Sequence, residues 1–175
     1  MILGGLLASA CTSATKAPRP QIVALRSTAD AIQVQADGEA FARVPLAAGQ
    51  PGVIEALLAH GGRHVLRGFP LNPRSGESVD HPEHLSMWTA HGSVGGIDFW
   101  KETKGPRLVG HSLRMQPGGR AVVEMKLDWR APGGEVLCSE DRVYSFRGTD
   151  QIRDVDVQIR LTANGDGVVF GDVRE

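Results

Sequence analysis

Residues 120–130 read RAVVEMKLDWR, and their alternation decides the fold class. One set of alternate positions is entirely apolar: Ala121, Val123, Met125, Leu127 and Trp129. The positions between them are mostly charged: Val122, Glu124, Lys126 and Asp128. A period of two places each set on its own face of a strand, whereas a helix would scatter the apolar residues around its axis. The stretch therefore predicts a long β-strand with one buried face.

The neighbouring segments repeat this alternation and are separated by turn sequences. Further strands are predicted at 106–116, 135–147 and 152–162, with more extended chain at 168–173. The joints PGG (117–119), APGG (131–134) and NGDG (164–167) carry the Gly, Pro and Asn residues that tight hairpins require. From residue 106 onward the sequence therefore predicts an antiparallel meander of long strands.

The first half of the chain also consists mainly of short strand-like runs. They are QIVALRST (21–28), AIQVQADG (31–38), EAFARVPL (39–46) and HVLRGFPL (64–71). PGVIEALLAHGG (51–62) fits either a helix or a strand followed by a turn, and the β context favours the strand. Because a sheet with one apolar face must bury it, we predict an all-β antiparallel sandwich of large twisted sheets, with residues 21–175 as a single domain.

Composition excludes several classes of protein. Hydrophobic residues make up 41% and charged residues 22% of the chain, which is typical of a folded domain. The formal net charge of −1 shows no basic footprint for nucleic acid. No apolar run approaches the roughly 20 residues that a membrane-spanning helix needs. We therefore expect no nucleic-acid partner, and contact with a membrane only through a lipid anchor.

The N-terminal stretch MILGGLLASAC (1–11) resembles the end of a bacterial lipoprotein signal, although no basic residue precedes its apolar part. Cleavage before Cys11 would leave this cysteine to carry lipid, with 12–20 as a polar tether. We therefore expect an exported protein that is lipid-anchored to the cell envelope. Cys138 then stands alone in an expected strand, where a buried, inert thiol is the simplest interpretation.

Three of the six histidines gather in the stretch 80–92, DHPEHLSMWTAHG. Pro82 disfavours a helix, so a loop (80–83), a strand (84–90) and a Gly-rich loop starting at His91 are expected. His81, His84 and His91, with a carboxylate from Asp80 or Asp98, would be a sensible ligand set for a divalent metal such as zinc or iron.

Two other hypotheses remain open for this stretch, since its spacing matches no strong zinc signature. A histidine oriented by Asp80 or Asp98 could transfer protons without metal, so all five residues are candidate catalytic groups. Alternatively, the histidines satisfy local hydrogen bonds and the tryptophans belong to the core. A small molecule or glycan is the expected ligand, and four residues are candidates for binding it: Trp88, Trp100, Glu124 and Arg160.

Three segments of the chain, with several rare residues in a fixed order, resemble those of a known protein family. GFP (68–70), DHPEHLSMWTAHGSVGGIDFW (80–100) and LTANGDGVVFGDVRE (161–175) resemble a family of exported bacterial proteins that carries the label methane oxygenase PmoA. Its hallmark is a DHPHH-type stretch followed by Trp, AHG and DFW. This chain departs from it at Glu83, where the family usually has a histidine, so a site built on that histidine would be altered.

The resemblance implies a role in carbohydrate-degrading systems and further strands beyond residue 175, so we expect the sandwich to be incomplete at that end. Methane oxidation is not inferred, because the genuine methane monooxygenase subunit is an integral membrane protein. The first hypothesis is a carbohydrate-active protein that works through its His/Asp cluster. The alternatives are a non-catalytic surface lipoprotein or binding module, and an inactive fragment.

Overall fold

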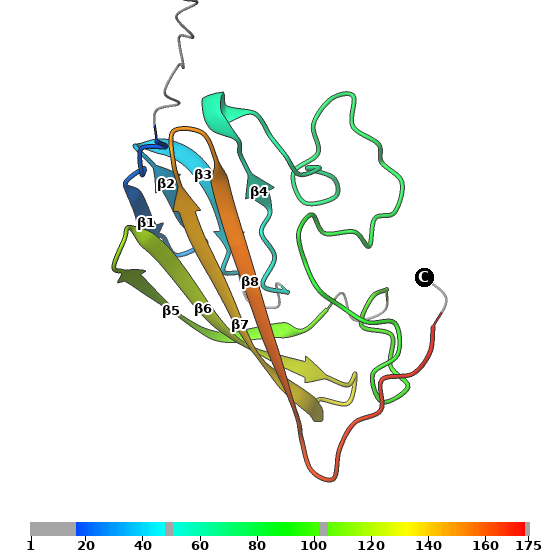
Figure 1. Cartoon of the computed structure of the whole chain (residues 1–175). Helices are drawn as coiled ribbons and strands as arrows, with labels where there is room; N and C mark the ends of the chain where they lie inside the picture. Colours follow the sequence, from blue (N-terminus) through cyan, green and yellow to red (C-terminus); the bar gives the residue numbers. More distant parts are fainter. Residues whose placement is uncertain (1–16, 48–50, 102–104, 174–175) are drawn as a thin grey trace, which may run out of the picture.

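The computed structural model describes residues 17–47, 51–101 and 105–173, and these residues are nearly all β (Figure 1). They form two antiparallel four-stranded sheets, which confirms the predicted all-β class. The first sheet has the order β1 (Val23–Ser27), β2 (Ala31–Ala36), β3 (Glu39–Pro45) and β4 (Ala56–Leu57). The second has the order β5 (Arg107–Gln116), β6 (Arg120–Arg130), β7 (Val136–Gly148) and β8 (Arg153–Ala163).

The second sheet is the predicted meander, in which each strand pairs with the next along the chain. The turns between β5, β6 and β7 fall at the Pro- and Gly-containing joints 117–119 and 131–134. The strand-and-turn interpretation of residues 51–62 is also confirmed, because they contain the short strand β4 and a single 3-10 turn, His60–Gly62. The short turns between consecutive strands thus largely determine the strand order of this sheet.

The core lies between the two sheets. The inward side chains of β6, from Ala121 to Trp129 at every second position, are at most 1% exposed. The first four of them share one cluster with apolar residues of β1, β2 and β3, whereas Trp129 belongs to a second cluster with Val94 and Phe99. Phe41 of β3 meets Phe146 of β7 edge to face, with ring centroids 5.6 Å apart. The alternation of residues 120–130 therefore identified the buried face correctly.

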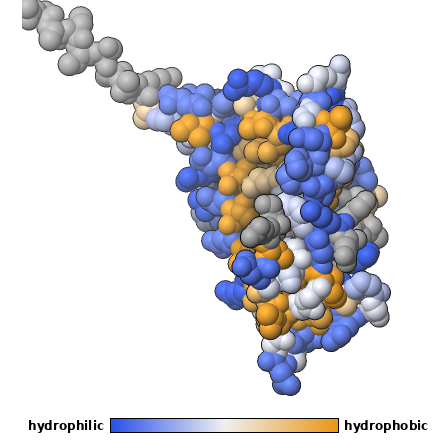
Figure 2. Space-filling model, turned by 90° about the vertical axis from the view of Figure 1, so that its right-hand side faces the viewer, coloured by the Kyte–Doolittle hydropathy of each residue, from blue (hydrophilic) through white to orange (hydrophobic). Residues whose placement is uncertain are grey.

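The apolar row of β8 is only partly covered. Val155 packs on the core, whereas Val157, Ile159 and Leu161 remain 38–41% exposed. The first sheet contacts mainly β6 and β7, so it does not extend over most of β8. Figure 2 shows hydrophobic side chains reaching the surface in a band on the right-hand side of the view in Figure 1.

Two predicted strands do not form, and the stretch expected to be extended at 168–173 forms no strand either. Residues 64–71 contribute only an isolated bridge between His64 and Leu58, and 168–173 only one between Phe170 and Val94. Residues 84–90 contribute a single bridge between Met87 and Ile54. The described chain from residue 63 to 101 is therefore an irregular loop region, drawn in green beside the sandwich in Figure 1. Irregular connections of this length are commonly functional.

The last residues of the expected tether contact the domain. The backbone N–H of Arg19 donates to Asp150 at 2.9 Å, and Pro20 pairs with Thr149. Cys11 and the predicted signal lie outside the described residues. Within the part of the chain that the structure describes, no helix is long and apolar enough to cross a membrane.

Candidate functional site

Two non-glycine residues in the left-handed conformation shape the histidine-rich segment. The φ angles are 49° at His81 and 64° at Ser86, whereas a strand needs φ near about −120° to −140°. Two backbone hydrogen bonds of 3.1 Å, from His84 N–H to the His81 carbonyl and from Ser86 N–H to the His84 carbonyl, close the turn. The alternation predicted for residues 84–90 is wrong, because these two residues fold the backbone back on itself.

This turn gathers His81, Glu83 and His84. One ligand atom from each residue lies within 4.8 Å of the others. Nδ1 of His81 lies 3.2 Å from Oε1 of Glu83, and the two imidazole rings stack with centroids 4.8 Å apart. Hydrogen bonds from its own backbone N–H and from His81 lower the pKa of Glu83. The cluster therefore combines two imidazoles with a carboxylate that is ionised at neutral pH.

Two imidazoles and one carboxylate are a donor set that suits zinc or iron. In a tetrahedral zinc site with bonds near 2.0 Å, neighbouring ligand atoms lie about 3.3 Å apart. The separation of His81 and Glu83 already matches this value, and the ligand atom of His84 lies within 4.8 Å of the other two. Three protein ligands leave a coordination position for water or substrate, which is typical of catalytic sites. The residues present therefore fit a divalent metal ion.

Arg67 holds this segment in place. Its guanidinium donates to the Asp80 carboxylate at 2.9 Å and to the backbone carbonyls of Asp80 and His81 at 3.0 Å. Its own carbonyl accepts a hydrogen bond of 2.7 Å from the Ser86 hydroxyl. The Ser78 hydroxyl, the His81 imidazole and Arg67 lower the pKa of Asp80. Arg67 thus links both left-handed residues, a role that no local sequence pattern indicated.

Two tryptophans flank the cluster. The indole of Trp100 meets His84 edge to face at 5.5 Å and lies 4.8 Å from the indole of Trp88, measured between ring centroids. Trp88 packs closely on Gly105, where an added Cβ would come within 3.1 Å of the indole. Both tryptophans are only partly buried. The structure therefore places these two predicted ligand-binding residues beside the histidine pair.

His91 and Asp98 have local partners instead. Nδ1 of His91 accepts a hydrogen bond of 3.1 Å from Ser93 N–H. Asp98 accepts from the backbone N–H groups of Trp100 and Lys101 at 2.8 and 2.9 Å, as a turn-capping aspartate does. Neither belongs to the cluster of possible metal ligands found among the described residues. Glu83, which was not predicted as a ligand, takes the place expected for His91 or a neighbouring aspartate.

The C-terminal half of the loop region is anchored on the second sheet. Val94 and Phe99 are fully buried in a second apolar cluster with Trp129 and Cys138. Burial raises the pKa of the Cys138 thiol to about 11, and the charge of Glu140 adds to this. Cys138 therefore stays protonated near neutral pH, and its predicted burial is confirmed.

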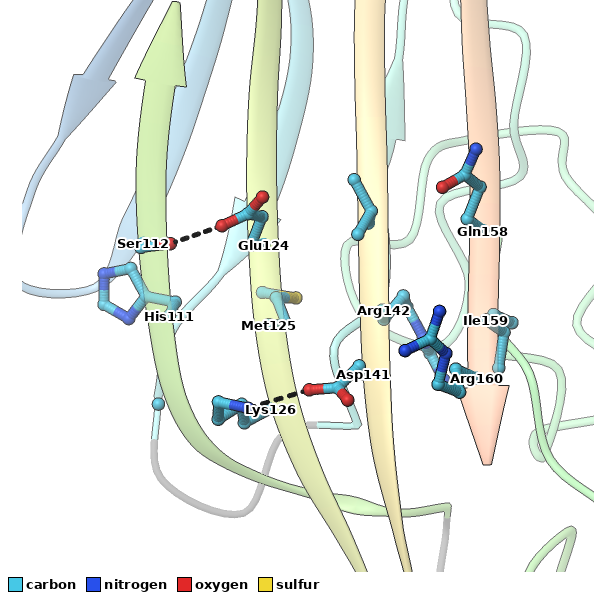
Figure 3. A pocket seen from close by; sticks show the side chains of 12 residues that line it. His111, Ser112, Glu124, Met125, Lys126, Asp141, Arg142, Gln158, Ile159 and Arg160 are labelled. Carbon is cyan, nitrogen blue, oxygen red and sulfur yellow. Dashed lines mark hydrogen bonds and ion pairs between the residues drawn. The ribbon is translucent and has the colours of Figure 1, made fainter. Parts of the chain in front are cut away.

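The outer face of the second sheet carries a separate pocket of about 620 Å³ (Figure 3). Three consecutive residues of each strand line it: 110–112, 124–126, 141–143 and 158–160. Figure 3 shows Ser112 joined to Glu124, and Lys126 joined to Asp141. The predicted ligand-binding residues thus fall into two groups. Glu124 and Arg160 line this pocket, whereas Trp88 and Trp100 lie beside the histidines.

A charged pair lies on the inner side of this sheet. Glu140 and Arg142 are fully buried and bonded to each other, and Arg142 also donates to the Gly52 carbonyl at 3.0 Å. The Tyr144 hydroxyl donates to the same carbonyl at 2.7 Å. The alternation of β7 could have revealed this pair, because both charges share a face with the apolar Cys138 and Phe146.

Of three comparisons with known proteins, one finds a match, and this match covers most of the chain. No curated protein and no solved structure matches it. A family model matches residues 31–175, which include all the strands from β2 to β8 and both candidate sites. The chain belongs to DUF6807, a family of unknown function.

Proposed function

We propose that this protein holds a divalent metal ion at His81, Glu83 and His84 and uses it to bind, and act on, carbohydrate beside Trp88 and Trp100. The observation that carries the proposal is the approach of three ligand atoms to within 4.8 Å of one another. The turn between two left-handed residues brings them together, and strained backbone of this kind is commonest at functional sites.

The surrounding residues have defined roles in this proposal. When bound, the metal would polarise a hydroxyl or lower the pKa of a water molecule. Glu83 supplies negative charge to the site, and Arg67 keeps Asp80 next to His81, whose Nε2 atom lies 3.8 Å from the carboxylate. The partly buried indoles of Trp88 and Trp100 offer an apolar surface for a sugar ring. The carbohydrate class itself rests on the resemblance to the exported PmoA-labelled family.

Export belongs to the same proposal. We infer that the protein is carried across the cytoplasmic membrane and attached to the cell envelope through lipid on Cys11. The change from the apolar stretch 1–10 to the polar residues 12–20 supports it. Radiolabelled palmitate incorporation into the wild-type chain, but not into Cys11→Ser, is the expected result.

Metal analysis tests the site directly. The purified protein is stripped with EDTA, titrated with Zn²⁺ and Fe²⁺ under anaerobic conditions, and assayed for bound metal by mass spectrometry. We expect one metal ion per chain in the wild type and a loss of most binding in His84→Ala. The control is His60→Ala, which removes an exposed histidine outside the cluster. Equal metal content in the two variants would contradict the proposal.

The second candidate is a non-catalytic binding module. The local hydrogen bonds of Asp80, His81 and Ser86 favour it, because they explain the shape of the loop without a metal. In this case glycan binding, measured on a glycan array, should be the same with and without EDTA and unchanged in His84→Ala. If glycan binding is instead lost both in EDTA and in His84→Ala, the result would support the metal-dependent function.

A further inference from the structure

The pocket on the second sheet is a trough that runs across its strands. Strand pairing aligns two rows of outward side chains along its sides. One row is Ser112, Glu124, Val143 and Gln158, and the other is Gly110, Lys126, Asp141 and Arg160. Rows two residues apart are separated by about 7 Å, and four strands at about 4.8 Å spacing give a length of about 14 Å. The trough therefore suits an elongated ligand.

The charged side chains along the trough pair with side chains of neighbouring strands, which leaves the space between the two rows open. The Glu124 carboxylate accepts hydrogen bonds from Ser112 Oγ at 3.0 Å and from Arg114 Nε at 2.8 Å, both on the neighbouring strand β5. Nζ of Lys126 lies 2.8 Å from the Asp141 carboxylate. Gly110 contributes no side chain, and a Cβ built there would meet nothing within 4 Å. The walls thus present fixed donors and acceptors of the kind that recognise sugar hydroxyls.

The β8 end of the trough carries a guanidinium, Arg160, whose charge acts on the Asp141 carboxylate without an ion pair between them. Glu124 is balanced by Arg114, and Asp141 by Lys126. Among the described residues, Arg160 has no ion pair or hydrogen bond, and the neighbouring Gln158 side chain has no hydrogen bond. A guanidinium can bind a carboxylate through two parallel N–H···O bonds, so Arg160 is suited to receive one.

We propose that this trough binds an acidic oligosaccharide, with Arg160 and Gln158 receiving the carboxylate of a uronic acid residue. The hydroxyl groups of the sugar contact the paired side chains of Glu124, Lys126 and Asp141. None of the residues that line the trough belongs to the His81, Glu83 and His84 cluster. Binding here is therefore independent of the metal site.

Calorimetry with two matched probes tests this inference. Trigalacturonic acid and its methyl ester have the same ring hydroxyls, but only the acid is charged. Both are titrated into the full chain in EDTA, so that the metal site does not contribute. We expect the acid to bind at least ten times more tightly than the ester.

Two arginine variants complete the test. Arg160→Gln should abolish the preference for the acid, whereas Arg147→Gln should retain it. Arg147, on β7, lies on the same outer face of the sheet as Arg160 but outside the trough. Equal melting temperatures of the two variants show that both fold. Equal affinity for acid and ester, no binding of either probe, or the same loss in both variants would overturn the inference. Binding that disappears in EDTA and in His84→Ala would also overturn it, while leaving the metal proposal intact.

Discussion

The indole N–H of Trp129 on β6 donates a hydrogen bond of 2.9 Å to Oε2 of Glu140 on β7, entirely within the protein interior. The other carboxylate oxygen accepts from Nε of Arg142. Both charges lie on the inward face of the second sheet, below the floor of the trough. The stability of this sheet therefore depends on a pair of buried charges as well as on apolar packing.

Removing one partner of this pair should be costly. Glu140→Ala leaves the Arg142 guanidinium buried without its counter-ion, and we expect the free energy of unfolding to fall by about 3–5 kcal/mol. Asp141→Ala is the control, because it breaks the exposed pair with Lys126 and should cost at most about 1 kcal/mol. Urea denaturation measures both values. Similar losses in the two variants would show that Glu140 contributes no more than a surface charge.

Gly52 should tolerate substitution far less well than Gly38. Both have positive φ, of 61° and 80° respectively, so alanine is strained at either position. An alanine Cβ at Gly52 would also lie 2.8 Å from Cδ2 of Leu127, whereas at Gly38 it would meet nothing within 4 Å. We expect Gly52→Ala to cost about 1–3 kcal/mol more than Gly38→Ala. Thermal unfolding of the two variants checks this difference, and equal melting temperatures would contradict it.

Cys138 should make the free energy of unfolding decrease as the pH rises through the alkaline range. Its folded pKa of about 11 lies above the unfolded value of about 8.5, so the unfolded chain loses its proton first. The contribution is fully present below pH 8.5 and decreases as the pH rises towards 11. In a Cys11→Ser background, Cys138→Ala should flatten this part of the stability curve.

The same thiol offers a kinetic measurement. At pH 8, mass spectrometry should detect iodoacetamide on Cys138 only after denaturant is added, because the reactive thiolate is suppressed in the folded state. Rapid labelling of the native protein would show that the site opens readily.

Arg67 should control metal affinity without being a ligand. Arg67→Met removes the bonds that hold Asp80 and the His81 carbonyl, so the ligands lose their fixed arrangement. Substitution of such supporting residues commonly weakens metal binding by about 10–100-fold. The exposed Arg63 provides the control variant, Arg63→Met, whose affinity should stay at the wild-type value in a Zn²⁺ titration. Identical affinities of the two variants would mean that Arg67 has only a structural role.

The alternation of apolar residues was enough to predict the second sheet. Residues 120–130 and their neighbours follow a period of two, and hairpin turns at fixed positions join them, so strand identity and order follow from local sequence. The first sheet was also predicted in its three longer strands. The partial exposure of β8 was not visible in its pattern, because coverage depends on how far the opposite sheet extends.

The candidate metal site was predicted only in part. The sequence drew attention to His81 and His84, but it predicted His91 as their partner and a regular strand over residues 84–90. The left-handed conformation of His81 and Ser86 replaced this strand with a turn, and no local sequence pattern predicted it. Glu83 joined the cluster while His91 bonded to Ser93, since loop geometry rather than spacing decides which side chains meet.

The limited coverage of β8 has a consequence for amide hydrogen exchange. β6 is bonded on both sides and fully buried along its inner face, so its amides should open only with global unfolding. β8 is bonded to β7 alone, and three of its inward side chains are partly exposed. Its amides should therefore exchange at a much lower opening free energy. Because Gln158 and Arg160 belong to β8, one end of the trough is built on an edge strand whose amide protons exchange more readily than those of β6.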